Sequence, residues 1–150
     1  MEKLLKVSAI KDGTVIDHIP TKALFKVMKI LRLEDCRQMV TFGNNLDSKA
    51  MGTKAIIKIA NRFFADEEVN KIALVAPHAK LNTIRDYEVV EKKVVETPKE
   101  IRGIVRCFNP KCITNAEKIT TRFEVLSDKP IAMKCFYCEK ITIENEMVFF

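Results

Sequence analysis

The sequence contains no tryptophan, four glycines and two histidines among its 150 residues. Because the glycines are few and not clustered, a glycine-rich phosphate-binding loop is excluded, and no G-x-S-x-G or Ser-His-Asp spacing occurs. No apolar run approaches the ~18 residues of a membrane span. Residues 1–6 lack the apolar core and cleavage site of a signal peptide. These absences predict a cytoplasmic protein that is not an enzyme and has no membrane partner.

Four of the five cysteines are arranged as two close pairs near the C-terminus, C-x4-C and C-x2-C. In a reducing compartment such pairs indicate a metal site more than disulfides, and four sulfur ligands suit a tetrahedral Zn²⁺. A full set of protein ligands leaves no position for water or substrate, so one structural ion is expected. Disulfides, an iron centre and a redox C-x-x-C are the alternatives. The predicted metal ligands are Cys107, Cys112, Cys135 and Cys138, and the isolated Cys36 is predicted to be a small buried or half-buried residue.

The formal charge of +6 comes mainly from the first part of the chain. Residues 1–96 carry 17 basic and 13 acidic side chains, whereas residues 97–150 carry 9 and 7. Four thiolates on one Zn²⁺ add a charge of −2, which leaves the C-terminal part close to neutral. Because nucleic-acid binding relies on basic side chains that neutralise phosphates, we expect no nucleic-acid partner for this part.

Hydrophobic periodicity predicts six strands and two helices before residue 97. Alternation favours a strand over residues 5–9, and the Asp12-Gly13 pair is typical of a hairpin turn. Apolar residues at helical spacing follow Pro20 and again follow Asp66, which we expect to cap the second helix. The polar stretch 46–52 is predicted to be a loop. The other predicted strands are residues 14–19, 38–42, 55–60, 80–84 and 87–95.

This order predicts an α+β fold. The first domain, residues 1–96, is expected to be a ferredoxin-like split βαβ sandwich, with an antiparallel sheet that carries two helices on one face and leaves the other face free. A polar junction is predicted at residues 97–103, followed by a small all-β zinc-binding domain at residues 104–150. Its predicted strands are residues 104–106, 120–126, 131–134 and 141–143.

Several polar residues of the first domain lie on or beside the predicted strands. If the sheet pairs as proposed, Lys58, Lys92 and His18 would meet a triphosphate, and Asp17 and Asn82 would bind ribose hydroxyls. Exposed backbone groups of Ala9 and Ile10 would read a base edge, because hydrogen bonds to a base give specificity. The alternative interpretation is a set of ordinary solvated strand residues.

Four segments of the chain resemble, in order, the regulatory chain of aspartate carbamoyltransferase. Residues 9–20 are similar to the signature A-I-x-x-G-T-V-I-D-H-I-P of that family, and residues 51–59 to M-G-x-K-x-x-I-K-I. Residues 82–90 resemble N-x-I-x-x-Y-E-V-V, and residues 107–114 with 135–139 resemble its two zinc knuckles. The resemblance covers nearly the whole chain.

The resemblance implies a non-catalytic subunit in pyrimidine biosynthesis, which binds ATP and CTP in its first domain and docks on the catalytic chain through its zinc domain. It also implies UTP as a candidate third effector and a regulatory dimer formed through the first domain. The residues that it implies for nucleotide binding are Ser8, Ala9, Ile10, Asp17, His18, Lys58, Asn82, Ile84, Tyr87, Val89 and Lys92. Those implied for contact with the catalytic chain are Asn109, Tyr137 and Glu139.

The sequence also departs from the family pattern. Ser8 stands where a glutamate is common, and Lys111 stands in the first knuckle where a small polar residue is common. Glu91 stands beside Lys92 where a glycine is frequent, which predicts an added negative charge close to the phosphates. The alternative hypothesis is a zinc-ribbon nucleic-acid-binding protein with a ferredoxin-like RNA platform. Against this hypothesis, the sequence lacks the pair of aromatic residues on a central strand that such platforms use to stack on bases.

Overall fold

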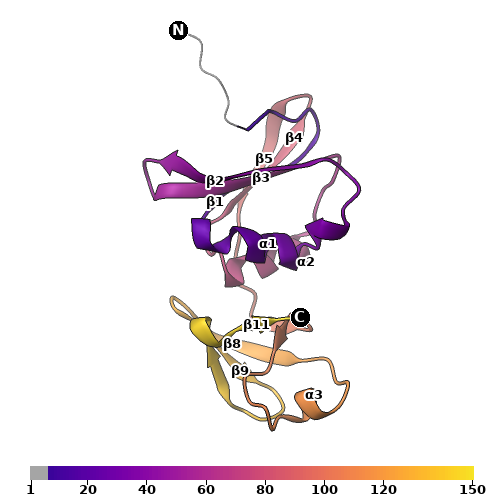
Figure 1. The fold of residues 1–150 in the computed structure, drawn as a ribbon, viewed down its shortest axis with the longest axis vertical. Coiled ribbons are helices and arrows are strands. Elements are labelled where there is room, and N and C mark those ends of the chain that lie inside the picture. The colour runs from indigo at the N-terminus through magenta and orange to yellow at the C-terminus, as the bar shows by residue number, and fades with distance from the viewer. Residues whose placement is uncertain (1–6) are drawn as a thin grey trace. The chain divides into compact units, whose positions relative to one another are not determined.

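The computed structural model describes residues 7–150. The chain divides into two compact units, Met1–Glu96 and Thr97–Phe150 (Figure 1). Within the described residues, no helix is long and apolar enough to cross a membrane.

The first unit is a five-stranded antiparallel sheet in the order β2-β3-β1-β4-β5. This is the split βαβ order with β5 added at one edge, and the predicted α+β class is confirmed. The strands are β1 (Gly13–Ile19), β2 (Val40–Ser48), β3 (Gly52–Ala60), β4 (Lys80–Arg85) and β5 (Glu88–Val94). The helices are η1 (Thr21–Ala23), α1 (Leu24–Ile30), η2 (Leu33–Asp35), α2 (Asp66–Asn70) and η3 (Lys71–Leu74).

Both α-helices lie on the same face of this sheet (Figure 1). Alternation along each strand sends one set of side chains into the core beneath the helices. Ile16, Ile57 and Leu81 belong to that core, together with Leu24 of α1 and Val69 of α2. The opposite face, called the helix-free face below, carries the side chains that alternate with these.

Two predictions about strands are wrong. Residues 7–10 form no strand, and residues 5–6 lie outside the described part of the chain. Gly13 therefore begins β1 and is not the turn of a hairpin; its φ of 139° suits glycine, and a Cβ there would lie 2.1 Å from the Ile59 carbonyl oxygen. The predicted loop 46–52 is also wrong, because β2 continues to Ser48 and β3 begins at Gly52. As an edge strand, β2 is only half-buried and shows no clear alternation of apolar residues.

The predicted cap of the second helix is displaced by one residue. Ala65 is the N-cap, and its backbone N–H donates to the Glu68 carboxylate at 3.4 Å. Asp66 is the first helical residue, where its negative charge still faces the positive end of the helix.

The helix-free face is not fully free. Residues 7–12, called the N-terminal strap below, run across it on the side opposite to α1 and α2 (Figure 1). Ile10 is 5% exposed and packs with Val15 of β1, Ile84 of β4 and Ile56 of β3. The strap therefore covers part of the surface where nucleotide contacts are predicted.

The second unit contains a four-stranded antiparallel sheet in the order β10-β9-β8-β6, and a pair formed by β11 and β7. Phe123 and Met133 are fully buried in it. Strand β6 lies within the stretch 97–103 that we predicted as a junction. The elements are β6 (Glu100–Arg102), β7 (Val105–Arg106), α3 (Ile113–Ala116), β8 (Arg122–Asp128), β9 (Ile131–Cys135), β10 (Ile141–Ile143), η4 (Glu144–Glu146) and β11 (Val148–Phe149).

Candidate functional site

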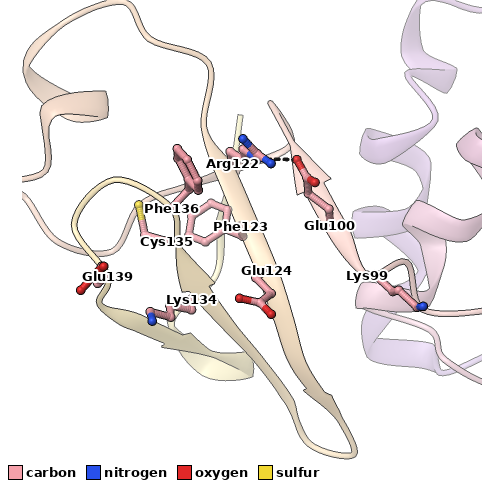
Figure 2. A pocket seen from close by; sticks show the side chains of 9 residues that line it. All are labelled: Lys99, Glu100, Arg122, Phe123, Glu124, Lys134, Cys135, Phe136 and Glu139. Atoms are coloured by element: carbon pink, nitrogen blue, oxygen red, sulfur yellow. Dashed lines mark ion pairs between the residues drawn. The ribbon is translucent and has the colours of Figure 1, made fainter.

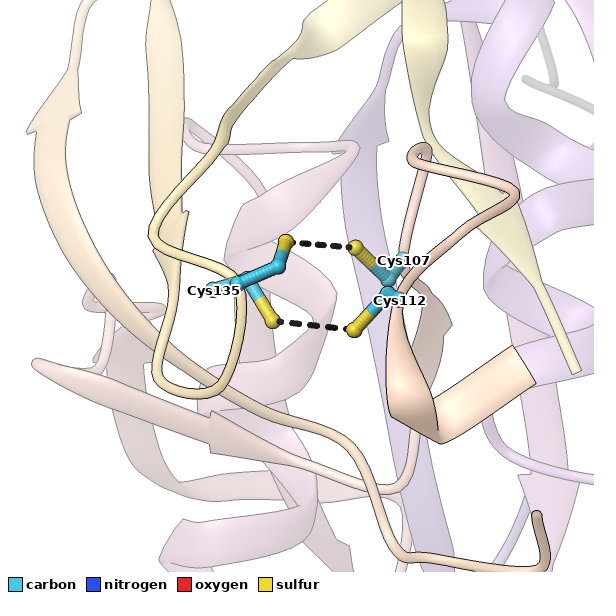
Figure 3. Close-up of side chains that lie close together, drawn as sticks. Cys107, Cys112 and Cys135 are labelled. Carbon is cyan, nitrogen blue, oxygen red and sulfur yellow. Dashed lines mark hydrogen bonds between the residues drawn. The ribbon is translucent and has the colours of Figure 1, made fainter. Parts of the chain in front are cut away.

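The four C-terminal cysteines converge in the second unit. Their sulfur atoms all lie within 4.8 Å of one another, although the two pairs are more than twenty residues apart in sequence. The Sγ atoms of Cys107 and Cys138 are 3.5 Å apart, and those of Cys112 and Cys135 are 3.8 Å apart (Figure 3). All four are free thiols, as is the half-buried Cys36.

This cluster has the dimensions of a tetrahedral metal site. Sulfur atoms bound to Zn²⁺ at about 2.3 Å lie about 3.8 Å from one another at the corners of a tetrahedron. The sulfur–sulfur separations of 3.5 and 3.8 Å agree with that edge, whereas a disulfide would need about 2.05 Å. The residues present therefore fit one ion with a closed ligand set.

Burial opposes ionisation of two of the four thiols. Burial raises the pKa of Cys107 and of Cys135. For Cys138 burial also raises the pKa, but hydrogen bonds from the Lys140 backbone and from the Asn109 side chain outweigh it, and the pKa falls to about 7. A divalent ion bound there would supply the attraction that the buried thiolates of Cys107 and Cys135 require.

Two residues that the sequence analysis missed fix the first knuckle. The side-chain amide of Asn115 donates to the Cys107 carbonyl at 3.0 Å and to the Asn109 carbonyl at 2.8 Å. The hydroxyl of Thr114 donates to the Cys112 sulfur at 3.2 Å. Both residues lie on α3, directly after Cys112, and that position was the only signal available in the sequence.

Aromatic side chains are exposed beside both knuckles. Phe108, Phe136 and Tyr137 are 55%, 58% and 43% exposed, and the rings of Phe136 and Tyr137 meet edge to face at 5.4 Å. Of the predicted partner contacts, Tyr137 and Glu139 are exposed, whereas Asn109 is half-buried and its side chain accepts the Lys111 N–H at 3.1 Å.

A cavity of about 450 Å³ lies next to the second knuckle (Figure 2). Arg122 spans it: its Nε lies 2.6 Å from the Glu100 carboxylate and its guanidinium lies 4.2 Å from the centre of the Phe136 ring. Glu139 also lines this cavity. The surface around the knuckles is therefore both apolar and charged.

The second candidate site is the helix-free face of the first unit. Lys58 of β3 lies opposite Val15 of β1, Val15 lies opposite Asn82 of β4, and Asn82 lies opposite Lys92 of β5. Residues directly opposite one another in a sheet point to the same face. Three predicted nucleotide contacts, Lys58, Asn82 and Lys92, thus form one row across four strands.

Asp17 is the centre of a second cluster, near the end of β1. Its carboxylate accepts the His18 N–H at 2.7 Å and lies 2.8 Å from Lys54 Nζ. His18 has a φ of 59°, and its buried Nδ1 has no hydrogen-bond partner among the described residues; it lies 3.6 Å from Asp17. Lys54 was missed in the sequence analysis, although it lies four residues before Lys58.

The remaining predicted contacts lie at the other end of the face. Ser8 and Ala9 are exposed on the strap and Ile10 is buried beneath it. Ile84 and Val89 are paired on β4 and β5. Tyr87 is 67% exposed in the turn between these strands, and its N–H donates to the Lys11 carbonyl at 2.8 Å.

Glu91 does not lie beside Lys92 on the helix-free face, contrary to the sequence prediction. Glu91 lies opposite Thr83, whose side chain belongs to the helix-covered face, and not beside Lys92 on the helix-free face. Its carboxylate pairs with Lys93 at 3.2 Å. One residue along a strand reverses the face, so adjacency in sequence does not bring this charge to the site.

Comparison with known proteins identifies the family of both units. Residues 5–96 match the family model described as the aspartate carbamoyltransferase regulatory chain, allosteric domain, and residues 99–148 match the metal binding domain of the same chain. The chain belongs to this family. Curated relatives named aspartate carbamoyltransferase regulatory chain include that of Bacteroides fragilis, which is 57% identical over 139 residues, covering 93% of this chain and 91% of the relative. That of Pyrococcus abyssi is 53% identical over 146 residues, covering 96% of each.

This membership confirms the prediction that the chain is a regulatory and not a catalytic subunit. It also confirms the resemblance found in the sequence. The family description also agrees with the cysteine cluster, because the metal binding domain contains all four thiols. The allosteric domain contains the row of Lys58, Asn82 and Lys92.

Proposed function

We propose that this regulatory chain senses nucleotides. ATP and CTP bind on the helix-free face of the first unit, Zn²⁺ holds the second unit in shape, and the second unit docks on the aspartate carbamoyltransferase catalytic chain in the cytoplasm. The observation that carries the proposal is the cross-strand row Lys58–Val15–Asn82–Lys92, which spans a domain described as allosteric.

The chemistry of this face suits a nucleoside triphosphate. Lys92 stands at one end of the row and offers an ammonium to the phosphates, while Lys58 stands at the other end, three strand spacings or about 14 Å away. The amide of Asn82 between them offers both a donor and acceptors for a base or ribose. Asp17, already paired with Lys54, adds an acceptor for ribose hydroxyls. UTP is a candidate for the same face.

Zinc is the proposed ion because four thiolates at tetrahedral spacing favour it over oxygen-seeking cations such as Mg²⁺ or Ca²⁺. Bound there, it would provide structural cross-linking and no chemistry on a substrate. Its proposed role is to hold the two knuckles so that Tyr137, Glu139 and Asn109 face the partner. The exposed ring pair of Phe136 and Tyr137 supports a protein partner, because aromatic side chains are enriched at interfaces.

The first unit is proposed to pair with a second copy. An apolar groove of about 390 Å³ lies between α1 and the edge strand β2, and Phe25, which lines it, is 67% exposed. Phe25 and Phe42 stack edge to face at 6.3 Å. Sedimentation of the zinc-loaded chain should report a dimer that Phe25→Lys dissociates.

Titration calorimetry of the full, zinc-loaded chain tests nucleotide binding. ATP and CTP should compete for one site. Lys92→Met should lower the affinity for each nucleotide by about tenfold, since a charge-assisted hydrogen bond from the ammonium to a phosphate is lost. Lys93→Met is the matched control, because Lys93 follows Lys92 on β5 but its ammonium pairs with Asp66 and Glu91. Absence of nucleotide binding by the wild-type chain would refute this proposal.

Effector coupling needs its own test, since binding regulates only if it differs between two states of the assembly. The catalytic chain should co-purify with this chain, and its aspartate dependence should shift when ATP or CTP is added. An unchanged activity in the assembled complex would show binding without regulation.

A further inference from the structure

The ammonium of Lys58 contacts the N-terminal strap. Its Nζ donates to the Val7 carbonyl at 2.9 Å and to the Ser8 carbonyl at 3.0 Å. An ammonium has three hydrogens, so two of the three face this backbone. Lys58 therefore differs from Lys92, whose ammonium makes no hydrogen bond or ion pair with any described residue.

The strap has further anchors that do not involve Lys58. The Val7 side chain fills the space left by Gly43 of β2, where a Cβ would lie 2.9 Å from Val7 Cγ2. At the other end, the Lys11 carbonyl accepts the Tyr87 N–H at 2.8 Å and the Asp12 carboxylate accepts the Asp86 N–H at 3.1 Å. The strap thus runs from β2 to the turn between β4 and β5, with Lys58 holding its first residues.

Between these anchors the strap offers free polar groups. Ser8 and Ala9 are exposed, and the backbone N–H groups of residues 8–10 donate to no described residue. A backbone edge held in this way can discriminate between bases only while it is fixed in place, because ordering it during binding would cost conformational entropy.

We propose that Lys58 is a positioning residue, whose ammonium clamps the N-terminal strap across the helix-free face so that residues 8–10 present a fixed edge to the nucleobase. Phosphate recognition then rests on Lys92. The identity of the ligand rests on the proposed function above, whereas the clamp itself does not.

The clamp makes a distinctive prediction about ligand classes. A lysine that binds phosphate affects triphosphates and leaves phosphate-free nucleosides unaffected. A lysine that orders the base-reading edge affects both equally. Lys58→Met should therefore weaken the binding of ATP and of adenosine by the same factor, about tenfold. The binding of CTP and of cytidine should be weakened equally as well. Lys92→Met should weaken ATP by about tenfold and adenosine by less than about twofold.

Backbone ¹⁵N relaxation of the full, zinc-loaded chain tests the clamp without any nucleotide. Order parameters of residues 7–9 should be about 0.85 in the wild type and below about 0.6 in Lys58→Met. Residues of β1 and β4 should stay rigid in both, which also shows that the variant is folded. Lys92→Met should leave the strap unchanged.

A second variant loosens the strap without altering any charge. Gly43→Ala places a Cβ 2.9 Å from Val7 Cγ2, so the Val7 side chain must leave its position and this anchor of the strap is disturbed although Lys58 is intact. It should lower the order of residues 7–9 and weaken ATP and adenosine alike. An ordered strap with unchanged affinities in this variant would show that the Val7 anchor does not hold the base-reading edge.

Three outcomes decide between the possibilities. A strap that stays ordered in Lys58→Met overturns the clamp. Loss of ATP affinity with adenosine affinity preserved in Lys58→Met also overturns it and makes Lys58 a phosphate ligand, while the proposed nucleotide sensor survives. A wild-type chain that binds neither ligand refutes the sensor, and the relaxation measurement then still decides the clamp.

Discussion

The two units of this chain are stabilised in different ways. In the first, helices α1 and α2 bury apolar side chains against a five-stranded sheet. In the second, fewer large side chains are fully buried, and four thiols from two distant turns converge instead. A module of about fifty residues buries too little apolar surface to be secure alone. The comparison implies that metal binding and folding are one process in the second unit and unrelated in the first.

The largest expected effect separates the units completely. Cys107→Ser removes one of four zinc ligands, and structural zinc contributes about 10–16 kcal/mol of apparent binding free energy. The second unit should lose its fold and its zinc, and co-purification with the catalytic chain should be lost with them, while amide spectra of the first unit persist. Cys36→Ser is the matched control, because that thiol lies outside the cluster. Assembly of Cys107→Ser with the catalytic chain would show that zinc does not shape the docking surface.

A substitution in the core of the first unit should destabilise that unit and leave the second unit unchanged. Ile57 is fully buried beneath the helices, so Ile57→Ala should lower the free energy of unfolding of the first unit by about 2–5 kcal/mol. Zinc stoichiometry and chelator resistance of the second unit should not change. Ile56→Ala, on the other face of the same strand, should cost less because Ile56 is only half-buried. Urea unfolding followed by amide spectra of each unit measures both effects. Coupled loss of zinc in Ile57→Ala would contradict independent stabilisation.

The same contrast explains what could be predicted from the sequence. The cysteine cluster depends on two short spacings, so its ligands were visible in the sequence without any knowledge of the fold. The helix-free face depends on register across β3, β1, β4 and β5, which periodicity does not give. The pairing of Lys58 with Val15 and of Asn82 with Lys92 appears only in the structure, as does the position of Glu91 on the other face.

The N-terminal strap shows where alternation misleads. Val7 and Ala9 alternate with Ser8 as in a strand, yet the buried residues are Val7 and Ile10, three apart. The strap is held by side-chain contacts and by Lys58 more than fifty residues away, and no local pattern records such a contact. The polar edge strand β2 was missed for a related reason: half-exposed strands need not alternate.

A smaller effect tests how far the second unit depends on the protein around its metal. Asn115→Ala removes the donor that serves the Cys107 and Asn109 carbonyls. Groups that support metal ligands typically change metal affinity by about 10–100-fold, so zinc affinity in a chelator competition should fall at the low end of that range. Asn115→Asp should lower zinc affinity more than Asn115→Ala does, since it places a hydrogen-bond acceptor against two carbonyl oxygens. Unchanged affinity in both variants would show that the thiols alone define the site.

The smallest expected effect concerns acid. Hydrogen bonds from Arg102, and then from Arg122, hold the pKa of the exposed Glu100 below its usual value of 4.5 despite some opposing desolvation. A carboxylate with a lowered folded pKa stabilises the fold above its unfolded pKa, and this contribution is lost as the pH falls through the folded pKa. The stability of the second unit should therefore decline below about pH 4.5 through this group.

At equal zinc loading, Glu100→Gln should slightly reduce the loss of stability that the second unit shows below about pH 4.5. Glu124→Gln is the matched control, because Glu124 lies directly opposite Glu100 on β8 and makes no ion pair with a described residue. Carboxyl NMR titration of the zinc-loaded chain would give the Glu100 pKa directly. If the measured pKa of Glu100 is not lowered, the arginine contacts are too solvent-exposed to stabilise the second unit.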